Sequence, residues 1–130
     1  MNFKKIKILI ADDHKLMREA IISCLAPNDN LEIVGEAIDG EEAIQKAEEL
    51  QPDIILLDIR MPKIDGIQAA KIIKRKNSEI KIIIISGLRE EEYISESIKA
   101  GATGYIIKDS ISINIETAIN TVLNNGTYLD

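Results

Sequence analysis

The chain has 130 residues, of which 45% are hydrophobic and 29% are charged, and this suits one globular domain with a mainly aliphatic core. Its net charge of -6 argues against a nucleic-acid or anionic-membrane surface, because such surfaces are basic. A lone cysteine, no signal-peptide pattern and no apolar run near the ~20 residues of a membrane span together predict a cytoplasmic protein.

Short apolar runs alternate with amphipathic runs along the chain. The apolar, β-branched runs predict five strands, at 6–11, 31–37, 53–58, 80–86 and 103–108. Apolar residues at helical spacing predict five helices, at 15–26, 41–50, 66–76, 90–100 and 113–125. Asp39 and Glu42 have the spacing of a capping box, and Gly101 is a predicted helix C-cap. We expect Cys24, in an amphipathic stretch, to pack as a small hydrophobe.

Strands that alternate with helices of about ten residues predict a parallel sheet with helices on both faces. The fold class is therefore α/β, with one doubly wound domain over residues 1–130. As a prior we take the flavodoxin-like strand order 2-1-3-4-5, which makes the first and third strands neighbours.

The residues that close the predicted strands are polar, although the strands themselves are apolar. They are Asp12 and Asp13, Asp58, Ser86 and Lys108. Ligands of open parallel sheets bind at the carboxyl ends of the strands, so we expect these side chains to meet at one edge. Three carboxylates in one place need a cation, and an all-oxygen site suits Mg²⁺ better than zinc. Such a cluster supports phosphoryl transfer with one carboxylate as the nucleophile.

Four motifs carry a family resemblance: "ILIADDH", "DIILLDIRMPKIDGI", "IIIISG" and "GATGYIIKDS", in this order. With them the chain resembles the receiver domain of bacterial two-component response regulators over essentially its whole length. The resemblance implies that Asp58 accepts a phosphoryl group from a sensor histidine kinase. It also implies that Asp13, Asp58 and the backbone carbonyl of Arg60 bind Mg²⁺, with Asp12 acting through water. Lys108 would pair with the phosphoryl group. Ser86 and Tyr105 would form the switch pair.

The stretches "DDHKLMREAI", "EIVGEAIDGEEAI" and "GYIIKDS" look most like the NarL/FixJ (LuxR-type) subfamily. Its members usually carry a C-terminal helix-turn-helix output domain, which residues 1–130 do not contain. DNA contact is therefore expected only through that missing part, and homodimerisation on phosphorylation is a further expectation. Many receivers have proline after the lysine, often in a cis peptide. Asp109 stands there in this chain, so we expect a trans bond.

Other functions remain as alternatives. A stand-alone receiver would act by protein contact alone. A phosphatase with an aspartyl nucleophile wants Asp-x-Asp after its first strand, and a nucleotide carrier wants a glycine-rich turn there, whereas this chain has Asp12, Asp13 and His14. We expect a switch with only self-phosphotransfer and slow self-dephosphorylation, not an enzyme. Tyr105 could also be a fixed core aromatic, and we expect His14 to be a loosely solvated polar residue.

Overall fold

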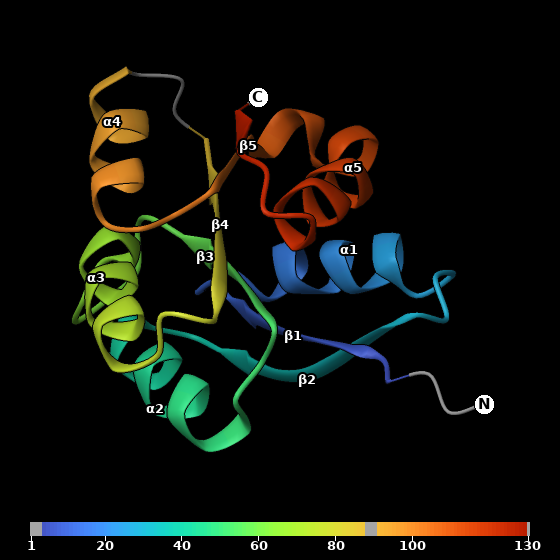
Figure 1. Cartoon of the computed structure of the whole chain (residues 1–130), viewed down its shortest axis with the longest axis horizontal. Coiled ribbons are helices and arrows are strands. Elements are labelled where there is room, and N and C mark those ends of the chain that lie inside the picture. Colours follow the sequence, from blue (N-terminus) through green and yellow to red (C-terminus); the bar gives the residue numbers. More distant parts are fainter. Residues whose placement is uncertain (1–3, 88–90, 130) are drawn as a thin grey trace.

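A parallel sheet separates two layers of helices in the computed structural model, which describes residues 4–87 and 91–129 (Figure 1). The strands are β1 (Ile6–Ala11), β2 (Leu31–Ala37), β3 (Ile54–Asp58), β4 (Lys81–Ser86), β5 (Gly104–Ile107) and β6 (Tyr128–Leu129). Their order in the sheet is β2-β1-β3-β4-β5-β6. The predicted order of the first five is confirmed, and with it the neighbouring positions of β1 and β3.

The prediction of five strands is wrong by one, because β6 extends the sheet beyond β5. Its two residues pair in parallel register with Gly104 and Tyr105, and the backbone N–H of Tyr128 donates to the carbonyl of Thr103 at 2.8 Å. A strand of two residues has no hydrophobic period, so sequence patterns cannot reveal it. It forms only because the chain turns back after the last helix, at the left-handed residue Asn125.

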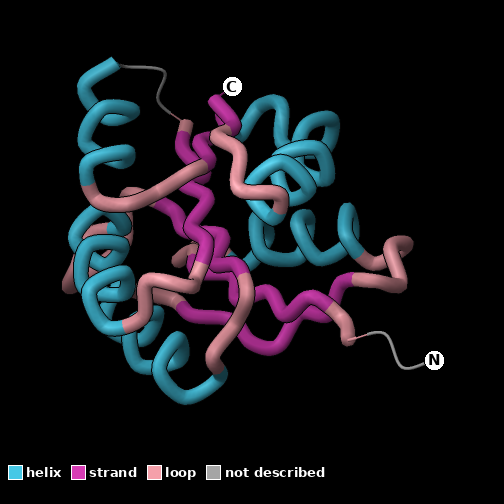
Figure 2. Tube along the Cα trace, in the orientation of Figure 1, coloured by secondary structure: helices cyan, strands magenta, loops and turns pink. Residues whose placement is uncertain are grey.

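The helices are α1 (Lys15–Leu25), α2 (Gly40–Leu50), α3 (Gly66–Lys76), α4 (Glu91–Lys99) and α5 (Ile111–Leu123). α1 and α5 cover one face of the sheet, and α2, α3 and α4 cover the other (Figure 2). α5 begins two residues before its predicted start, directly after a 3₁₀ turn at Lys108–Ser110. The fourth helix is predicted over 90–100, and residue 90 lies outside the described residues.

Two helix ends, the start of α2 and the end of α4, follow the predicted signals. The Asp39 carboxylate accepts from the backbone N–H of Glu42 at 2.7 Å, and the Glu42 carboxylate accepts from the N–H of Ile38 at 3.2 Å. This is a capping box whose return bond reaches one residue beyond the N-cap. Gly101 follows α4 with a φ of 106°, a left-handed conformation that favours glycine, so the predicted C-cap is confirmed.

Each face of the sheet has its own aliphatic core, because side chains alternate along a strand. Leu9, Leu57 and Tyr105 are buried on the side of α2, α3 and α4. Ile10 and Leu56 are buried on the side of α1 and α5, where the half-buried Cys24 also packs, as expected. None of the described helices has the length and apolar character needed to cross a membrane.

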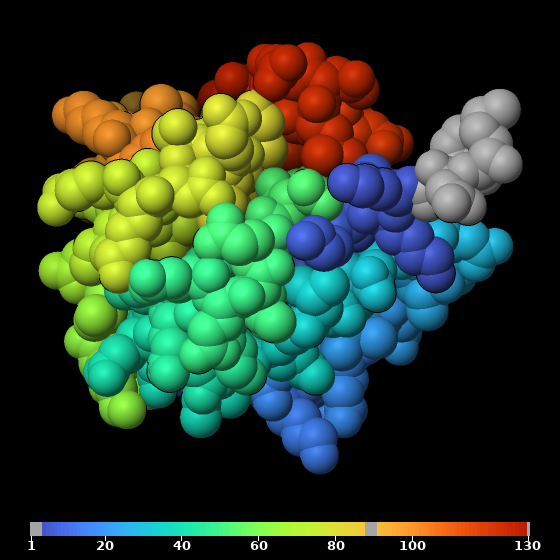
Figure 3. Space-filling view, turned by 60° about the horizontal axis from the view of Figure 1, so that its bottom comes forward, coloured from blue at the N-terminus to red at the C-terminus, as the bar shows by residue number. Residues whose placement is uncertain are grey.

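The edge of the sheet where strands begin is distinct from the edge that carries the polar strand ends. Figure 3 faces the edge where strands begin, and there the segments before β1, β3 and β4 lie side by side. Backbone bonds join them, with Asp53 donating to Lys7 at 2.8 Å and Lys81 donating to Asp53 at 3.0 Å. The polar strand ends described next lie at the opposite edge.

Candidate functional site

The site is built where β1 and β3 end side by side. Ala11 of β1 is in register with Leu57 of β3, so the acids that follow them, Asp12 and Asp58, emerge at the same edge. Both side chains are buried, at 2% and 4% exposure, whereas Asp13 is more accessible. Burial of two carboxylates this close together is costly unless cations compensate it.

Lys108 provides one such cation. It opens the 3₁₀ turn that follows β5, and its Nζ lies 3.4 Å from Oδ2 of Asp12 and 3.4 Å from Oδ1 of Asp58. The ammonium therefore bridges the two buried acids. The predicted convergence of Asp12, Asp58 and Lys108 at one edge is found in the structure.

Asp58 has an unusual electrostatic environment. Desolvation by burial, followed by the charge of Asp12, raises its pKa from 3.8 to about 6, and Lys108 partly offsets the rise. Its Oδ2 atom is buried and has no hydrogen-bond partner among the described residues. A buried carboxylate oxygen without a partner is a position at which a cation would be stabilised.

The donor set fits a divalent cation. Asp12, Asp13, His14 and Asp58 each offer a ligand atom, and these atoms all lie within 4.8 Å of one another. Three of the four donors are carboxylates, the hard oxygen ligands that Mg²⁺ prefers. Together with the unpartnered oxygen of Asp58, this arrangement is compatible with a magnesium site.

The loop between β3 and α3 lies next to the site and is fixed by hydrogen bonds. The backbone N–H of Gly66 donates to the carbonyl of Ile59 at 2.7 Å, and the Asp65 carboxylate caps α3. A Cβ on residue 66 would lie 2.0 Å from the carbonyl oxygen of Asp58, so only glycine fits there. Arg60, in the same loop, lines a groove together with Asp13, and its role as a metal ligand stays a prediction.

Ser86 and Tyr105 lie on neighbouring strands next to these acids. Ser86 ends β4 in register with Ile107, and Tyr105 precedes Ile107 by two residues on β5, so both side chains are on the same face of the sheet. Both are buried, at 2% and 1% exposure. This adjacency is what a coupled pair requires, and the switching itself stays a prediction.

The peptide bond between Lys108 and Asp109 is trans, as predicted, because the described chain contains no cis peptide. His14 is 68% exposed at the start of α1, which agrees with the expectation of a solvated polar residue. Its Nδ1 atom also lies 3.2 Å from Oδ1 of Asp12 and 3.0 Å from Oδ1 of Asp13.

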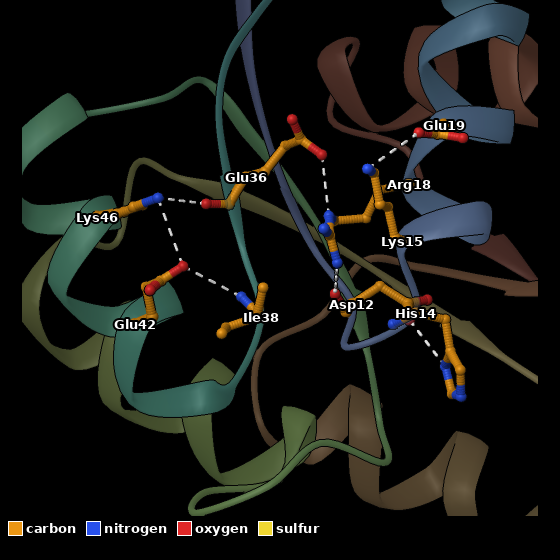
Figure 4. Close-up of polar contacts among 9 residues, drawn as sticks. All are labelled: Asp12, His14, Lys15, Arg18, Glu19, Glu36, Ile38, Glu42 and Lys46. Carbon is orange, nitrogen blue, oxygen red and sulfur yellow. Dashed lines mark hydrogen bonds and ion pairs between the residues drawn. The ribbon is translucent and has the colours of Figure 1, made fainter.

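Arg18 of α1 is a contributor that sequence reasoning missed. Its Nη1 donates to the backbone carbonyl of Asp12 at 2.8 Å, and its Nε donates to Oε1 of Glu36 at 2.9 Å (Figure 4). Lys46 of α2 in turn contacts the carbonyl of Glu36. The position of Arg18, one turn into a helix that follows two acids, is only a weak indication in the sequence of a role at the site. Its partner on β2, Glu36, comes near only in the tertiary fold.

Comparison with known proteins gives one family. The model of the response regulator receiver domain matches residues 8–120. The chain is 35% identical to the transcriptional regulatory protein DegU of Brevibacillus brevis, over 99% of this chain and 55% of that protein. It is 37% identical to the response regulator GacA of Pseudomonas syringae, over 95% of this chain and 58% of that protein. The chain thus spans somewhat more than half the length of these relatives.

Solved structures agree with the sequence relatives. A LuxR-family two-component response regulator from Aurantimonas superposes with a TM-score of 0.91 at 27% identity, covering 96% of this chain and 89% of that one. The signal receiver domain of the putative response regulator NarL from Mycobacterium tuberculosis superposes with a TM-score of 0.86 at 32% identity, covering 93% and 98%. Both neighbours carry the subfamily names that the sequence motifs suggested.

Proposed function

Because the chain belongs to the response regulator receiver domain family, we propose that it is a signalling switch in which Asp58 accepts a phosphoryl group from a sensor histidine kinase. The observation that carries the proposal is the buried Asp58 carboxylate, with one oxygen paired to Lys108 at 3.4 Å and the other without a partner. The carboxylate is thus held on one side, and its other oxygen has no hydrogen-bond partner among the described residues.

The proposed reaction is a phosphoryl transfer between two side chains. An oxygen of Asp58 attacks the phosphorus of the kinase phosphohistidine, so that an O–P bond forms while the N–P bond breaks. The electron pair of the broken bond returns to the imidazole nitrogen, and Asp58 becomes an acyl phosphate. With a pKa of about 6, Asp58 is mostly ionised at neutral pH, as a nucleophile must be. The Lys108 ammonium is placed to donate to a phosphoryl oxygen.

The proposed magnesium ligands are Asp13, Asp58 and the backbone carbonyl of Arg60, with Asp12 acting through water. When bound, Mg²⁺ supplies positive charge that offsets the carboxylates and the phosphoryl oxygens. Asp12 contributes further by sharing Lys108 with Asp58, which holds the ammonium over the nucleophile.

The proposed response is a shift between two conformations. A phosphoryl group on Asp58 attracts the Ser86 hydroxyl and the Lys108 ammonium, and the movement of Ser86 changes the space beside Tyr105. Tyr105 lies in the core under α4, so its movement alters the surface formed by α4, β5 and α5. Phosphorylation shifts the equilibrium only through such differential contacts with the two states.

We propose that residues 1–130 form the receiver domain of a cytoplasmic transcription regulator. Its relatives include proteins named as transcriptional regulators, and the chain covers 55% of DegU. In this proposal a helix-turn-helix output domain outside this chain contacts DNA, and phosphorylation promotes homodimerisation. Catalysis is limited to self-phosphotransfer and slow self-dephosphorylation. The alternative is a receiver that acts by protein contact alone, and reading the gene beyond codon 130 distinguishes the two.

Intact mass measurement tests the phosphoacceptor. The protein is incubated with a small acyl phosphate and Mg²⁺, and we expect the mass of one added phosphoryl group. The adduct disappears in Asp58→Ala and persists in Asp29→Ala, which alters an exposed acid in the turn between α1 and β2. A phosphoryl adduct that survives Asp58→Ala contradicts the assignment.

A further inference from the structure

A side-chain contact joins the ring of His14 to Asp12 (Figure 4). His14 is the N-cap residue of α1, with extended backbone angles, but its side chain makes no capping hydrogen bond to the described helix. Its ring nitrogen Nδ1 instead faces one oxygen of Asp12 and one of Asp13. The imidazole therefore contacts the acidic cluster and does not cap the helix.

We propose that His14 is a metal ligand that makes this site selective for first-row transition-metal dications, such as Co²⁺, over Mg²⁺. The inference rests on the proposed function, because it uses the same acids. It adds one donor, Nδ1 of His14, that the proposed magnesium site does not use.

The distances are those of ligands around a single ion. Metal–ligand bonds of about 2.1 Å place adjacent octahedral ligands about 3.0 Å apart and opposite ones about 4.2 Å apart. Nδ1 of His14 lies 3.0 Å from Asp13 and 3.2 Å from Asp12. The full set, including Asp58, lies within 4.8 Å, so small side-chain movements bring all four donors onto one ion.

The unpartnered oxygen of Asp58 is a second observation that points to a bound cation. Its Oδ2 is buried, and no group among the described residues satisfies it. The side chain as a whole is only 4% exposed, so bulk water is a poor substitute. His14, by contrast, is 68% exposed. A cation that enters from solvent therefore meets the imidazole first and the unpartnered carboxylate oxygen at the bottom of the site.

The chemistry of the donors sets the selectivity. Imidazole nitrogen is a good ligand for first-row transition metals, whereas Mg²⁺ prefers oxygen and dehydrates reluctantly. Removing the nitrogen should thus weaken Co²⁺ binding and leave Mg²⁺ binding almost unchanged. If His14 acted only as a hydrogen-bond partner of the acids, its removal would affect both cations alike.

The chain contains one histidine, so a histidine signal has one source. The protein is prepared without a polyhistidine tag, and Co²⁺ is added. A directly bound imidazole shows strongly shifted proton resonances, because the paramagnetic ion is bonded to the ring. We expect such resonances in the parent protein, and we expect none in His14→Ala.

Calorimetric titration supplies the second readout, with Co²⁺ and Mg²⁺ added separately. We expect His14→Ala and His14→Gln to weaken Co²⁺ binding by roughly tenfold or more, while the Mg²⁺ affinity changes less than about twofold. Gln keeps a hydrogen-bonding side chain but lacks the imidazole. Lys15→Ala, which alters the exposed neighbour, is the matched control and should behave as the parent does.

An unchanged Co²⁺ affinity in both His14 variants, or the absence of shifted imidazole resonances in the parent, overturns the inference. The phosphoryl adduct measured with Mg²⁺ is a separate readout. If that adduct forms on Asp58 while the Co²⁺ affinity is the same with and without His14, only the proposal on metal selectivity is wrong. If no adduct forms, the proposed function fails whatever the Co²⁺ titration shows.

Discussion

Nζ of Lys108 lies 3.4 Å from Oδ1 of Asp58, although the two residues close different strands of the sheet. The same ammonium lies 3.4 Å from Asp12. One cation thus holds two buried acids, and the second oxygen of Asp58 is buried without a hydrogen-bond partner among the described residues. The predictions below test what this arrangement and its supports contribute.

Replacing Lys108 with Met should slow phosphoryl transfer to Asp58. A hydrogen bond to a charged group contributes about 1.5–3 kcal/mol, so we expect the rate of adduct formation to fall roughly tenfold to a hundredfold. Timed intact mass measurement with a small acyl phosphate gives the rate. Lys63→Met removes an exposed ammonium that pairs with Asp39 instead and should leave the rate near the parent value. Equal rates in the two variants would exclude this role for Lys108.

Replacing Asp58 with Asn should stabilise the protein at neutral pH when cations are chelated. The folded-state pKa of about 6 lies above the ordinary 3.8, so the folded protein binds this proton more tightly than the unfolded chain does. Stability is therefore lost as pH rises from about 4 through about 6. The loss reaches at most about 3 kcal/mol, because one unit of pKa difference corresponds to 1.36 kcal/mol.

Urea unfolding at several pH values, with a chelator present, measures this effect. We expect the advantage of Asp58→Asn to be largest near pH 8 and to shrink toward pH 4, where Asp58 is protonated in both states. Asp29→Asn, at an exposed loop position, should show no such trend. An Asn variant that is less stable than the parent at pH 8 would contradict the burial cost assigned to Asp58.

Arg18→Met should weaken Mg²⁺ binding without removing a ligand. Arg18 bonds the carbonyl of Asp12 and the carboxylate of Glu36, and both bonds are lost with the guanidinium. The backbone that carries the acids is then less well held, and the loss of a supporting partner typically costs about 10-fold or more in metal affinity. Calorimetric titration with Mg²⁺ measures it.

Lys46→Met is the matched control for Arg18, because Lys46 contacts the carbonyl of Glu36 but no residue of the acidic cluster. We expect its Mg²⁺ affinity to stay close to that of the parent. Hydrogen exchange at the amides after β1 should rise in Arg18→Met alone. Equal Mg²⁺ affinities in Arg18→Met and the parent would show that Arg18 does not position the acids.

Gly66→Ala should destabilise the protein and disturb the site. The added Cβ would lie 2.0 Å from the carbonyl oxygen of Asp58, so either α3 or the end of β3 must move. Overpacking of this kind costs about 1–3 kcal/mol, and more where backbone must shift. Gly87→Ala is the control, because a Cβ there meets no atom of the described residues within 4 Å. Thermal unfolding compares the two, and similar losses in both would contradict the steric argument.

Much of the fold follows from local pattern. The strands at 6–11 and 31–37 and the helix at 66–76 have the bounds that hydrophobic period and turn residues predicted. The polar strand ends also follow, since a carboxylate that interrupts an apolar run marks the sheet edge. β6 does not follow, because two residues carry no period and their pairing depends on the position of β5.

What the sequence determined by itself was the alternation of strands and helices, the polar residues that close the strands and the family that the motifs belong to, because these depend on the order of side chains along the chain. The tertiary structure alone decided that Arg18 reaches Asp12, that the His14 ring faces the acids and that the pKa of Asp58 is raised. The pKa of Asp58 depends on burial beside Asp12 and Lys108, which are remote from it in sequence, and Arg18 is oriented by a second bond to Glu36 on another strand. The acids beside the His14 ring are its neighbours in sequence, but a hydrophobic pattern does not set the direction of the ring.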